Sequence, residues 1–463
     1  MLNFRRNVLA HSCKRLGATS GSERLLFAGI CGYILSQAYM IPLIGIGPSW
    51  AVWPSAADIM VLLLAPLVVL QPIFDRTAQQ VWVALVGWTL ACCTSFITIT
   101  ALNVSGTGAI GFGKGIGFGE FGIYRLLQIL VVFRAVTLCR MSPWRLKVLR
   151  YVTLATFFMI CAGVWATYFN LISPMNLSSH LPHTQVVAGA WYSYMYPVDR
   201  GLGTIGYNHG YVALQLILSA MVALSLGVRS SGLALRLFVL ISCTGSVLLT
   251  GSRAGLFAAV LFSILELLST QRRSIPTLCA ITGVVILSLL LFDFSVPPDM
   301  KAAVDRMQTV STSFESDGLS GRRTIWEDRI AFLWAEPVRW VVGSGFGSAV
   351  DGGNNAHMLP LQVVTEMGLT GMLALCWLGF RVSRPLLVRQ STGSVIMHGS
   401  IALLTTCLTQ ETFYPVPAFG HFLSFFFVIV ALTISCSHPL KADQVGLHRA
   451  RHVSRRNPPP ILV

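Results

Sequence analysis

Arginine and histidine side chains that could bind an anion and transfer a proton are concentrated in a few polar segments of this chain. The segment 294–357 contains Arg322, Arg323 and Trp326, and it ends with Asn354-Asn355-Ala356-His357. Charged residues make up only 11% of the chain, so we expect chemistry where they gather. Guanidinium groups bind phosphate oxygens through paired hydrogen bonds. The imidazole of His357 titrates near neutral pH, so it could act as a general base or hydrogen-bond a phosphate or a sugar hydroxyl.

The turn Gly251-Ser252-Arg253-Ala254-Gly255 is a second candidate anion site. Ser252 is a residue type that caps helix N-termini, and the helix after it would offer free N–H groups and the positive end of its dipole. Arg253 adds a planar donor group suited to phosphate. A lone arginine at a membrane boundary usually extends its charge towards water, but the cap and the two glycines favour an anion site here.

Further polar side chains lie near the ends of other predicted helices. The segment RGLGTIGYNHG combines glycines, which allow close backbone approach, with Arg200, Asn208 and His209. This segment suits a binding site and a scaffold equally well. Arg125 lies about one turn from the outer end of its predicted helix, where it could contact a lipid phosphate or extend its charge to water.

Residues 320–340 predict an amphipathic helix. Ile325, Trp326, Ile330 and Leu333 recur at helical spacing in this segment. The helix could lie flat at the outer surface of the membrane that the chain spans, as a structural element. It could instead present an arginine to a lipid phosphate, and the sequence leaves both alternatives open.

Acidic residues give little support for a metal site. No Asp-x-Asp or His-x-x-x-His pattern occurs in the segments 103–120, 174–206, 250–254 and 294–357, which are predicted below to lie outside the membrane. We therefore predict chemistry without a metal ion or other cofactor. Glu366 follows His357 by nine residues, which places it about half a helical turn round from the histidine. We expect Glu366 to be buried against other helices in a structural role.

The elements that must position these residues are membrane helices. Hydrophobic residues make up 54% of the 463 residues, and the mean hydropathy is +0.68, whereas a soluble domain would carry about 25% charged residues. The net charge of +15 sits in short clusters between apolar runs, which is typical of the positive-inside pattern rather than of nucleic-acid binding. We therefore predict an all-α integral membrane protein.

Stretches of about 20 apolar residues predict about twelve transmembrane helices, near 25–47, 55–71, 79–102, 121–139, 149–173, 207–227, 233–250, 254–270, 275–293, 358–380, 394–411 and 415–436. With the N-terminus inside, the inner segments hold 22 of the 33 Lys and Arg residues. An even number of spans puts both termini in the cytoplasm. The polar motifs then fall in or beside the outer segments 103–120, 174–206, 250–254 and 294–357.

The predicted organisation is one polytopic membrane domain, 25–436, between a cytoplasmic N-terminal tail, 1–24, and a basic cytoplasmic tail, 437–463. The large outer loop 294–357 separates the ninth and tenth spans. The basic tail would lie near anionic lipid headgroups. Chemistry is therefore expected at the outer face of the membrane.

The order of these motifs resembles the O-antigen ligase and polymerase superfamily of bacterial envelope glycan enzymes. The matching pieces are the GSRAG turn, then GRRTIW and VVGSGFGSA in the large outer loop, and then AHMLPLQVVTEMGLTG, a His followed by Glu-x-Gly-x-x-Gly. The earlier RGLGTIGYNHG is similar to the first outer-loop motif of that family. The resemblance covers about residues 200–380, and the first five spans match in hydropathy only.

The resemblance implies a membrane-embedded helical glycosyltransferase, similar to the type C fold, in the bacterial inner membrane with its site facing the periplasm. Such an enzyme transfers a glycan from undecaprenyl diphosphate to an acceptor without a metal. Carried over by motif, Arg253 and Arg322 would bind the diphosphate, with Arg323 an equal alternative to Arg322, and His357 would serve the acceptor or the leaving group. The further expected contacts are Arg200 and Arg125 with the diphosphate, and Asn208, His209, Asn355 and Trp326 with the glycan or acceptor.

Two features favour a polymerase, which would join lipid-linked repeat units into an O-antigen, capsule or exopolysaccharide. Met358 follows His357 where many members of the family have Asn, and an extra glycine-rich segment occupies the outer loop 103–120. The alternative is a ligase that moves the finished glycan to lipid A–core. A further alternative, a transporter or flippase, would predict paired charges at mid-membrane and repeated halves. The expected partners are the lipid-linked glycan, a growing polysaccharide or lipid A–core acceptor, membrane lipids and a chain-length regulator protein, with no nucleic acid.

Overall fold

The computed structural model describes residues 20–44, 54–69, 71–73, 75–103, 118–177, 201–205, 208–227, 233–270, 322–348, 355–387, 392–415 and 420–435. Every regular element in these ranges is a helix, which confirms the all-α prediction for this part of the chain. Several predicted features lie outside the described residues, namely the span 275–293, the tail 437–463, the glycine-rich run 104–117, Arg200 and Asn354.

The longer helices are α2 (Ser20–Ser36), α3 (Ala56–Val68), α4 (Arg76–Asn103), α5 (Phe118–Leu138), α6 (Pro143–Tyr168), α9 (His209–Gly227), α10 (Leu233–Thr250), α11 (Arg253–Thr270), α14 (Arg322–Ala335), α17 (Leu359–Leu387), α18 (Thr392–Thr406) and α19 (Gly420–Ser435). Two helices of four residues are α7 (Pro174–Leu177) and α15 (Arg339–Val342). Each predicted span other than 275–293 overlaps one of these helices. The largest difference is at α2, which ends at Ser36 because residues 37–44 turn and include Pro42, a residue without an N–H donor.

Six of the described helices are long and apolar enough to cross a membrane, namely α4, α5, α6, α9, α10 and α17. Shorter apolar helices cover Ala56–Val68, Ser394–Thr406 and His421–Ser435. The chain is therefore a multi-pass membrane protein. The count of twelve spans and the orientation of the helices stay predictions.

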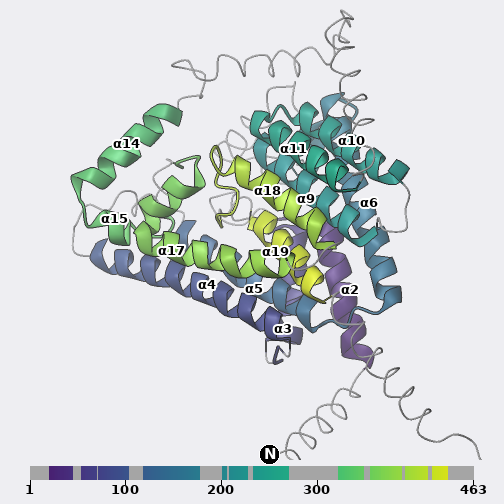
Figure 1. The fold of residues 1–463 in the computed structure, drawn as a ribbon, viewed down its shortest axis with the longest axis horizontal. Helices are drawn as coiled ribbons and strands as arrows, with labels where there is room; N and C mark the ends of the chain where they lie inside the picture. The colour runs from purple at the N-terminus through teal and green to yellow at the C-terminus, as the bar shows by residue number, and fades with distance from the viewer. Residues whose placement is uncertain are drawn as a thin grey trace, which may run out of the picture.

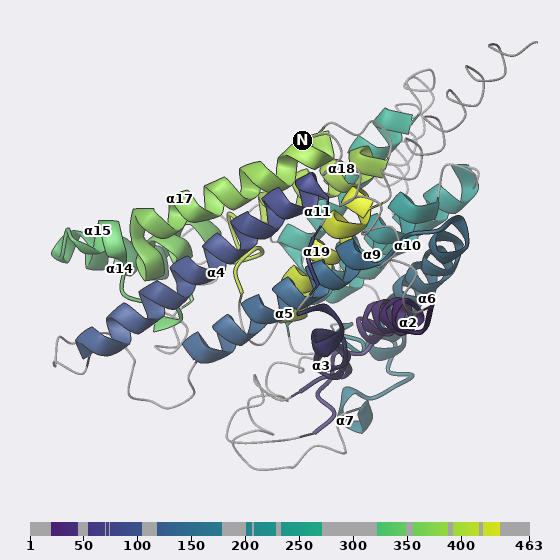
Figure 2. The same cartoon turned by 90° about the horizontal axis from the view of Figure 1, so that it is seen from below.

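The helices pack around α9. This helix contacts α6, α10, α11, α18 and α19, and its stretch His209–Leu226 is 83% buried inside the protein, so it is a central helix rather than a lipid-facing one. Figures 1 and 2 show α4 and α17 running side by side, and α5 packs along α19. The N-terminal ends of α9, α11 and α17 carry the polar motifs.

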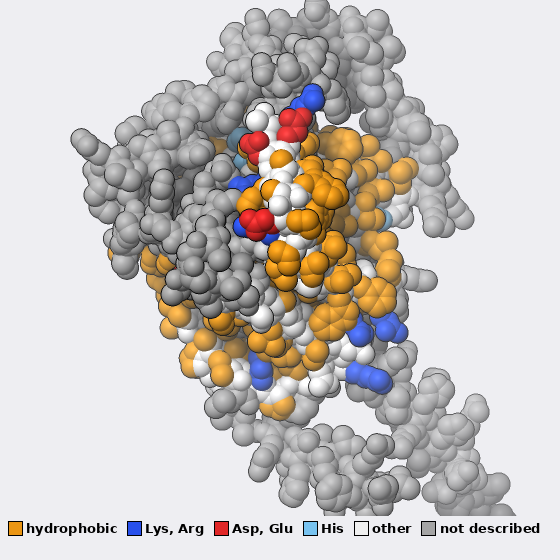
Figure 3. Space-filling model, turned by 90° about the vertical axis from the view of Figure 1, so that its left-hand side faces the viewer, with side chains coloured by type: hydrophobic (Ala, Val, Ile, Leu, Met, Phe, Trp, Pro, Cys, Tyr) orange, Lys and Arg blue, Asp and Glu red, His pale blue; other side chains and the backbone are white. Residues whose placement is uncertain are grey.

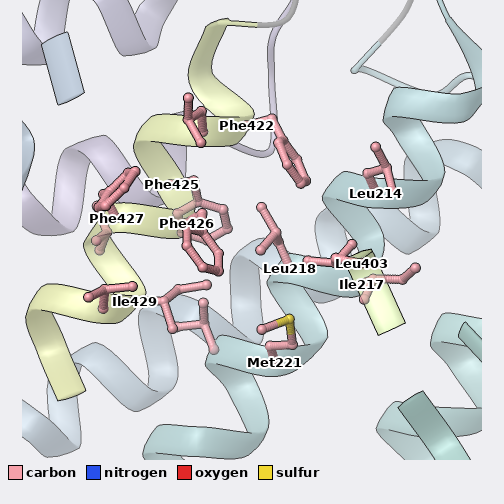
Figure 4. Close-up of a cluster of buried hydrophobic side chains, with 14 of the residues drawn as sticks. Leu214, Ile217, Leu218, Met221, Leu403, Phe422, Phe425, Phe426, Phe427 and Ile429 are labelled. Carbon is pink, nitrogen blue, oxygen red and sulfur yellow. The ribbon is translucent and has the colours of Figure 1, made fainter. Parts of the chain in front are cut away.

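An apolar cluster fixes α18 and α19 against α9 (Figure 4). Its labelled side chains are Leu214, Ile217, Leu218 and Met221 from α9, Leu403 from α18, and Phe422, Phe425, Phe426, Phe427 and Ile429 from α19. Because lipid chains are as apolar as these side chains, close van der Waals packing holds them together in a membrane. The turn 407–415 between α18 and α19 is consequently held next to the start of α9.

Helix α17 contains a break that binds the segment after α15. Gly368 has a positive φ of 65° inside the helix. Ser344 and Gly345 donate their backbone N–H groups to the carbonyl oxygens of Thr365 and Glu366 at 2.8 and 2.7 Å. The Val341 carbonyl lies so close to Gly368 that a Cβ there would overlap it. The large predicted outer loop is thereby held to the helix that begins just after His357.

Replacing Gly368 tests this contact. Gly368→Ala should destabilise the protein by at least about 1–2 kcal/mol, because a left-handed backbone is costly for alanine and the added methyl would collide with Val341. The measurement is the thermal midpoint of the purified protein in detergent. Gly379→Ala is the matched control in the same helix, since nothing lies within 4 Å of its Cβ position. Equal midpoints for the two variants would contradict the described break.

Candidate active site

Four polar residues from separate parts of the chain converge at one place. They are Arg253 at the start of α11, Arg322 at the start of α14, His357 just before α17, and Glu411 in the turn after α18. Burial lowers the pKa of Arg322, the nearby Glu411 raises it, and the nearby Arg253 lowers it. His357 lies against Glu411 and within electrostatic reach of Arg322. The structure thus brings together three of the residues predicted from sequence and adds an acid.

Local hydrogen bonds build the turn that carries Arg253. Ser252 Oγ accepts the N–H of Gly255 at 3.1 Å, which confirms the predicted N-cap. Gly251 adopts a positive φ of 72°, a conformation that glycine reaches without strain. Gly255 lies so close to Ala213 of α9 that no side chain would fit. Arg253 therefore begins a helix whose first turn is capped and fixed to the central helix.

Helix α14 separates its two adjacent arginines. Arg322 is half-buried and turns towards Glu411 and Arg253. The side chain of Arg323 is 67% exposed and pairs with Glu327 at 2.8 Å. Arg329, two turns further along α14, is buried. Burial lowers its pKa, and the nearby Glu366 opposes that effect only in part. Of the two neighbours that the sequence could not distinguish, Arg322 is the one at the cluster.

Trp326 holds α14 to the residue before His357. Its indole N–H donates to the carbonyl of Ala356 at 2.7 Å. Leu333 of α14 packs with Ala356 and with Leu361 and Val364 of α17 in a small apolar cluster. Trp326, which the sequence predicts as a glycan contact, therefore has a protein partner that fixes the position of the arginine helix relative to His357.

Glu411 determines the conformation of His357. The histidine has a positive φ of 50°, which is uncommon for a residue other than glycine. Its backbone N–H donates to Glu411 Oε1 at 2.7 Å, and its Nδ1 lies 3.5 Å from the same oxygen. The carboxylate is 2% exposed and the imidazole 40%. The Nδ1 edge of the ring thus lies beside the acid, while part of the ring remains accessible.

The surroundings of His357 favour its neutral form. Burial lowers its pKa, Glu411 opposes that effect, and the positive charge of Arg322 lowers the pKa further. The net direction is downward from the ordinary value of about 6.5. A neutral imidazole can accept a proton, so His357 has the protonation state that a general base requires.

Glu366 has the structural role that its spacing predicts. It is fully buried and accepts hydrogen bonds from Gln362 Nε2 and the Gly347 N–H, both at 2.8 Å, and from the Tyr414 hydroxyl. Gln362 in turn accepts the N–H of Ala356 at 2.8 Å. This network links α17, the segment after α15 and the turn that carries Glu411.

The segment before α9 lies beside the same turn. Asn208 Oδ1 accepts the N–H of Gly210 at 2.8 Å and so caps α9, and His209 is the first, half-buried residue of that helix. A Cβ at Gly210 would overlap the side-chain amide of Gln410, so the two residues lie in contact. Asn208 and His209 therefore start the helix next to the Glu411 turn, while their contact with a glycan stays a prediction.

Asn355 lies two residues before His357. It is half-buried, and its Oδ1 has no hydrogen-bond partner among the described residues. The structure gives it no role of its own, so its predicted contact with glycan or acceptor stays a prediction.

Arg125 belongs to a second polar group. It is buried and pairs with Asp58 of α3, and it also bonds to Gln128 Oε1 at 2.8 Å and lies 3.1 Å from His421 Nε2 of α19. Asp58 also accepts from Gln128 Nε2 at 2.6 Å. This group ties α3, α5 and α19 together, so the described contacts of Arg125 are structural.

Glu411 is the site residue that sequence reasoning missed. It lies at the end of the predicted span 394–411, 54 residues after His357, so no local pattern joins the two. One signal was present, because Glu411 is the only acidic residue between Glu366 and Asp443. An isolated acid at a membrane boundary is costly and points to a partner.

Residues 237–376 match the family described as O-antigen ligase. The match supports the O-antigen ligase and polymerase superfamily. It confirms the resemblance drawn from the motifs, and its range includes Arg253, Arg322 and His357, whereas Glu411 lies beyond its end. No curated protein matches the chain. Among the described residues, no group of three or more His, Cys, Asp and Glu side chains could hold a metal ion. Metal independence stays a prediction.

Measuring the stability of variants tests whether the contacts of Arg125 are structural. Arg125→Ala should lower the free energy of unfolding by about 3–5 kcal/mol, because it leaves the buried Asp58 without its cationic partner. The double variant Asp58→Asn with Arg125→Gln removes both charges and should recover much of the loss. The measurement is the thermal midpoint in detergent. A normal midpoint for Arg125→Ala combined with lost glycan transfer would instead support direct contact with a diphosphate.

Proposed function

We propose that this protein is a glycosyltransferase that polymerises undecaprenyl-diphosphate-linked repeat units into O-antigen, capsule or exopolysaccharide. The reaction would take place at the periplasmic face of the bacterial inner membrane. The observation that carries the proposal is the convergence of Arg253, Arg322 and His357 from three separate segments. The family match supports an enzyme of the glycosyltransferase kind.

The two arginines would bind the diphosphate of the donor. When the bond between the sugar and the diphosphate breaks, negative charge grows on the leaving group. Arg253 at a capped helix start and Arg322 at another helix start place positive charge and N–H donors where that charge develops. Such preorganised donors typically contribute about 2.7–4 kcal/mol each to lowering the barrier.

His357 would act on the acceptor. The acceptor hydroxyl oxygen bonds to the anomeric carbon of the donor sugar, its proton passes to the imidazole, and the electron pair of the broken bond leaves with the diphosphate. Glu411 would orient the ring and stabilise the imidazolium that forms. A positioned base commonly contributes about 10²–10⁴-fold to the rate.

A ligase is the second candidate function. The matching family is described as O-antigen ligase, and a ligase would use the same donor and the same arginines. The two functions differ in the acceptor, which is a growing polysaccharide for a polymerase and lipid A–core for a ligase. Met358 after His357 and the glycine-rich segment 103–120 favour the polymerase, for which a chain-length regulator protein is a further proposed partner.

Complementation of a deletion strain tests the function and the choice of arginine. The wild-type gene should restore long-chain glycan on a gel, and Arg322→Ala should reduce transfer by about 10²–10³-fold and leave single-repeat product. Arg323→Ala is the matched control and should restore normal polymer, since its exposed ion pair contributes little.

Three outcomes would decide against parts of the proposal. Polymer that accumulates on the lipid carrier, with bare lipid A–core, would identify a ligase. Loss of polymer with Arg323→Ala and not with Arg322→Ala would contradict the arginine assignment. Normal polymer with both Arg253→Ala and His357→Ala, in protein that still inserts into the membrane, would contradict the site.

The pH dependence of transfer tests His357 as a base. Because its pKa is lowered, the neutral form should persist below pH 6.5, and the initial rate should fall only at lower pH. Glu411→Gln removes the charge that holds the pKa up, so the fall should move to still lower pH, and the plateau rate should drop by about tenfold or more. Glu327→Gln, an exposed acid on α14, should leave the profile unchanged. A fall centred above pH 6.5, unmoved by Glu411→Gln, would contradict this role.

A further inference from the structure

The side of α14 and α15 that faces away from the protein carries a row of apolar side chains. Ile330, Trp334 and Val338 are 42%, 67% and 65% exposed, and Val341 and Val342 continue the row at 51% and 48%. Ile330 and Trp334 share one side of α14, and Val338, Val341 and Val342 extend the exposed apolar run through the turn 336–338 into α15. We call them the apolar ridge.

The ridge lies on the outside of a segment that is anchored on its inside. Leu333 is fully buried against α17, and Trp326 is tied to Ala356. Arg339 keeps its charge compensated, because it bonds to Glu336 at 2.7 Å and stacks over Phe332 at 4.3 Å. Charge pairing of this kind lowers the cost of bringing the segment close to a nonpolar phase.

Polarity changes along the length of α14. The first turns expose the ion pair of Arg323 and Glu327, whereas the exposed row from Ile330 onward is apolar. A helix with one charged end and one apolar end suits a boundary between water and lipid, and tryptophan, as at Trp334, is enriched at that boundary.

The ridge is continuous with exposed apolar side chains of α17. The Thr370 hydroxyl donates to the carbonyl of Val341 at 3.1 Å, and the next exposed side chains on α17 are Leu369 and Leu373, at 48% and 70%. Helix α17 is one of the six candidate membrane spans. In Figure 3, which faces this side of the molecule, hydrophobic side chains cover the described surface between charged side chains in its upper and lower parts.

We propose that the apolar ridge inserts among the acyl chains of the membrane leaflet on the side of the candidate site. Insertion fixes the depth of α14, and Arg322 lies at its other end, about 12 Å along the helix axis from Ile330. Insertion would place Arg322 at the level of the lipid headgroups. This inference rests on the proposed function, in which a lipid-anchored donor presents its diphosphate at that level.

Fluorescence quenching in liposomes tests the insertion. An environment-sensitive fluorescent amino acid is placed at position 338 of the full chain, and at position 327 as the control on the same segment. Position 338 should show blue-shifted emission that phospholipids with brominated acyl chains quench, and position 327 should show neither. Equal weak quenching at both positions would overturn the proposal. Emission at 338 that changes on dilution with unlabelled protein, without lipid quenching, would assign the ridge to a second copy of the chain and also overturn it.

This measurement needs no glycan transfer, so its failure is distinct from failure of the proposed function, which His357→Ala reports. The consequence for Arg322 is tested with Val338→Glu, which should raise the KM for the lipid-linked donor by about tenfold while kcat changes little. Ala335→Glu, an exposed position on another side of α14, is the matched control. An equal effect of the two variants would overturn the link between insertion and Arg322.

Discussion

The candidate site depends on the interactions of the Glu411 carboxylate. It accepts the backbone N–H of His357, lies 3.5 Å from the imidazole, and offsets part of the charge of Arg322. Two guanidinium groups brought close together would repel each other without such an acid. Glu411 thus joins the turn after α18 to both His357 and Arg322.

Other buried charges in the described residues are matched differently. Asp58 pairs with Arg125, and Glu266 pairs with Arg236 at 2.8 Å and with His398 at 2.9 Å. These pairs join neighbouring helices and have the character of structural contacts. The site also relies on such contacts, because the network around Glu366 and the break at Gly368 hold the arginine helix, α17 and the Glu411 turn in one arrangement. The geometry of the site therefore depends on packing residues outside it.

The sequence predicted those structural features that depend on neighbouring residues. Long apolar runs predicted the described helices, although the ends differ by 11 residues at the end of α2 and by seven at the end of α17. Ser252 predicted the cap of α11, because a cap depends on neighbouring residues. The choice between Arg322 and Arg323 depends on how α14 is rotated against α17, which Trp326 and Leu333 decide through tertiary contacts. Glu411 was missed because its proximity to His357 comes from the packing of α18 and α19 on α9. Arg125 suggested a lipid phosphate because its partner Asp58 lies 67 residues away.

We propose that Arg253, Arg322 and His357 form one site for a diphosphate-linked glycan. A cryo-electron microscopy structure of the full chain with a polyprenyl diphosphate glycan analogue would test this directly. We expect diphosphate density between Arg253 and Arg322, with the first sugar beside His357 and the Arg125–Asp58 pair intact. Density for the diphosphate at Arg323, or at Arg125 with that pair broken, would contradict this proposal.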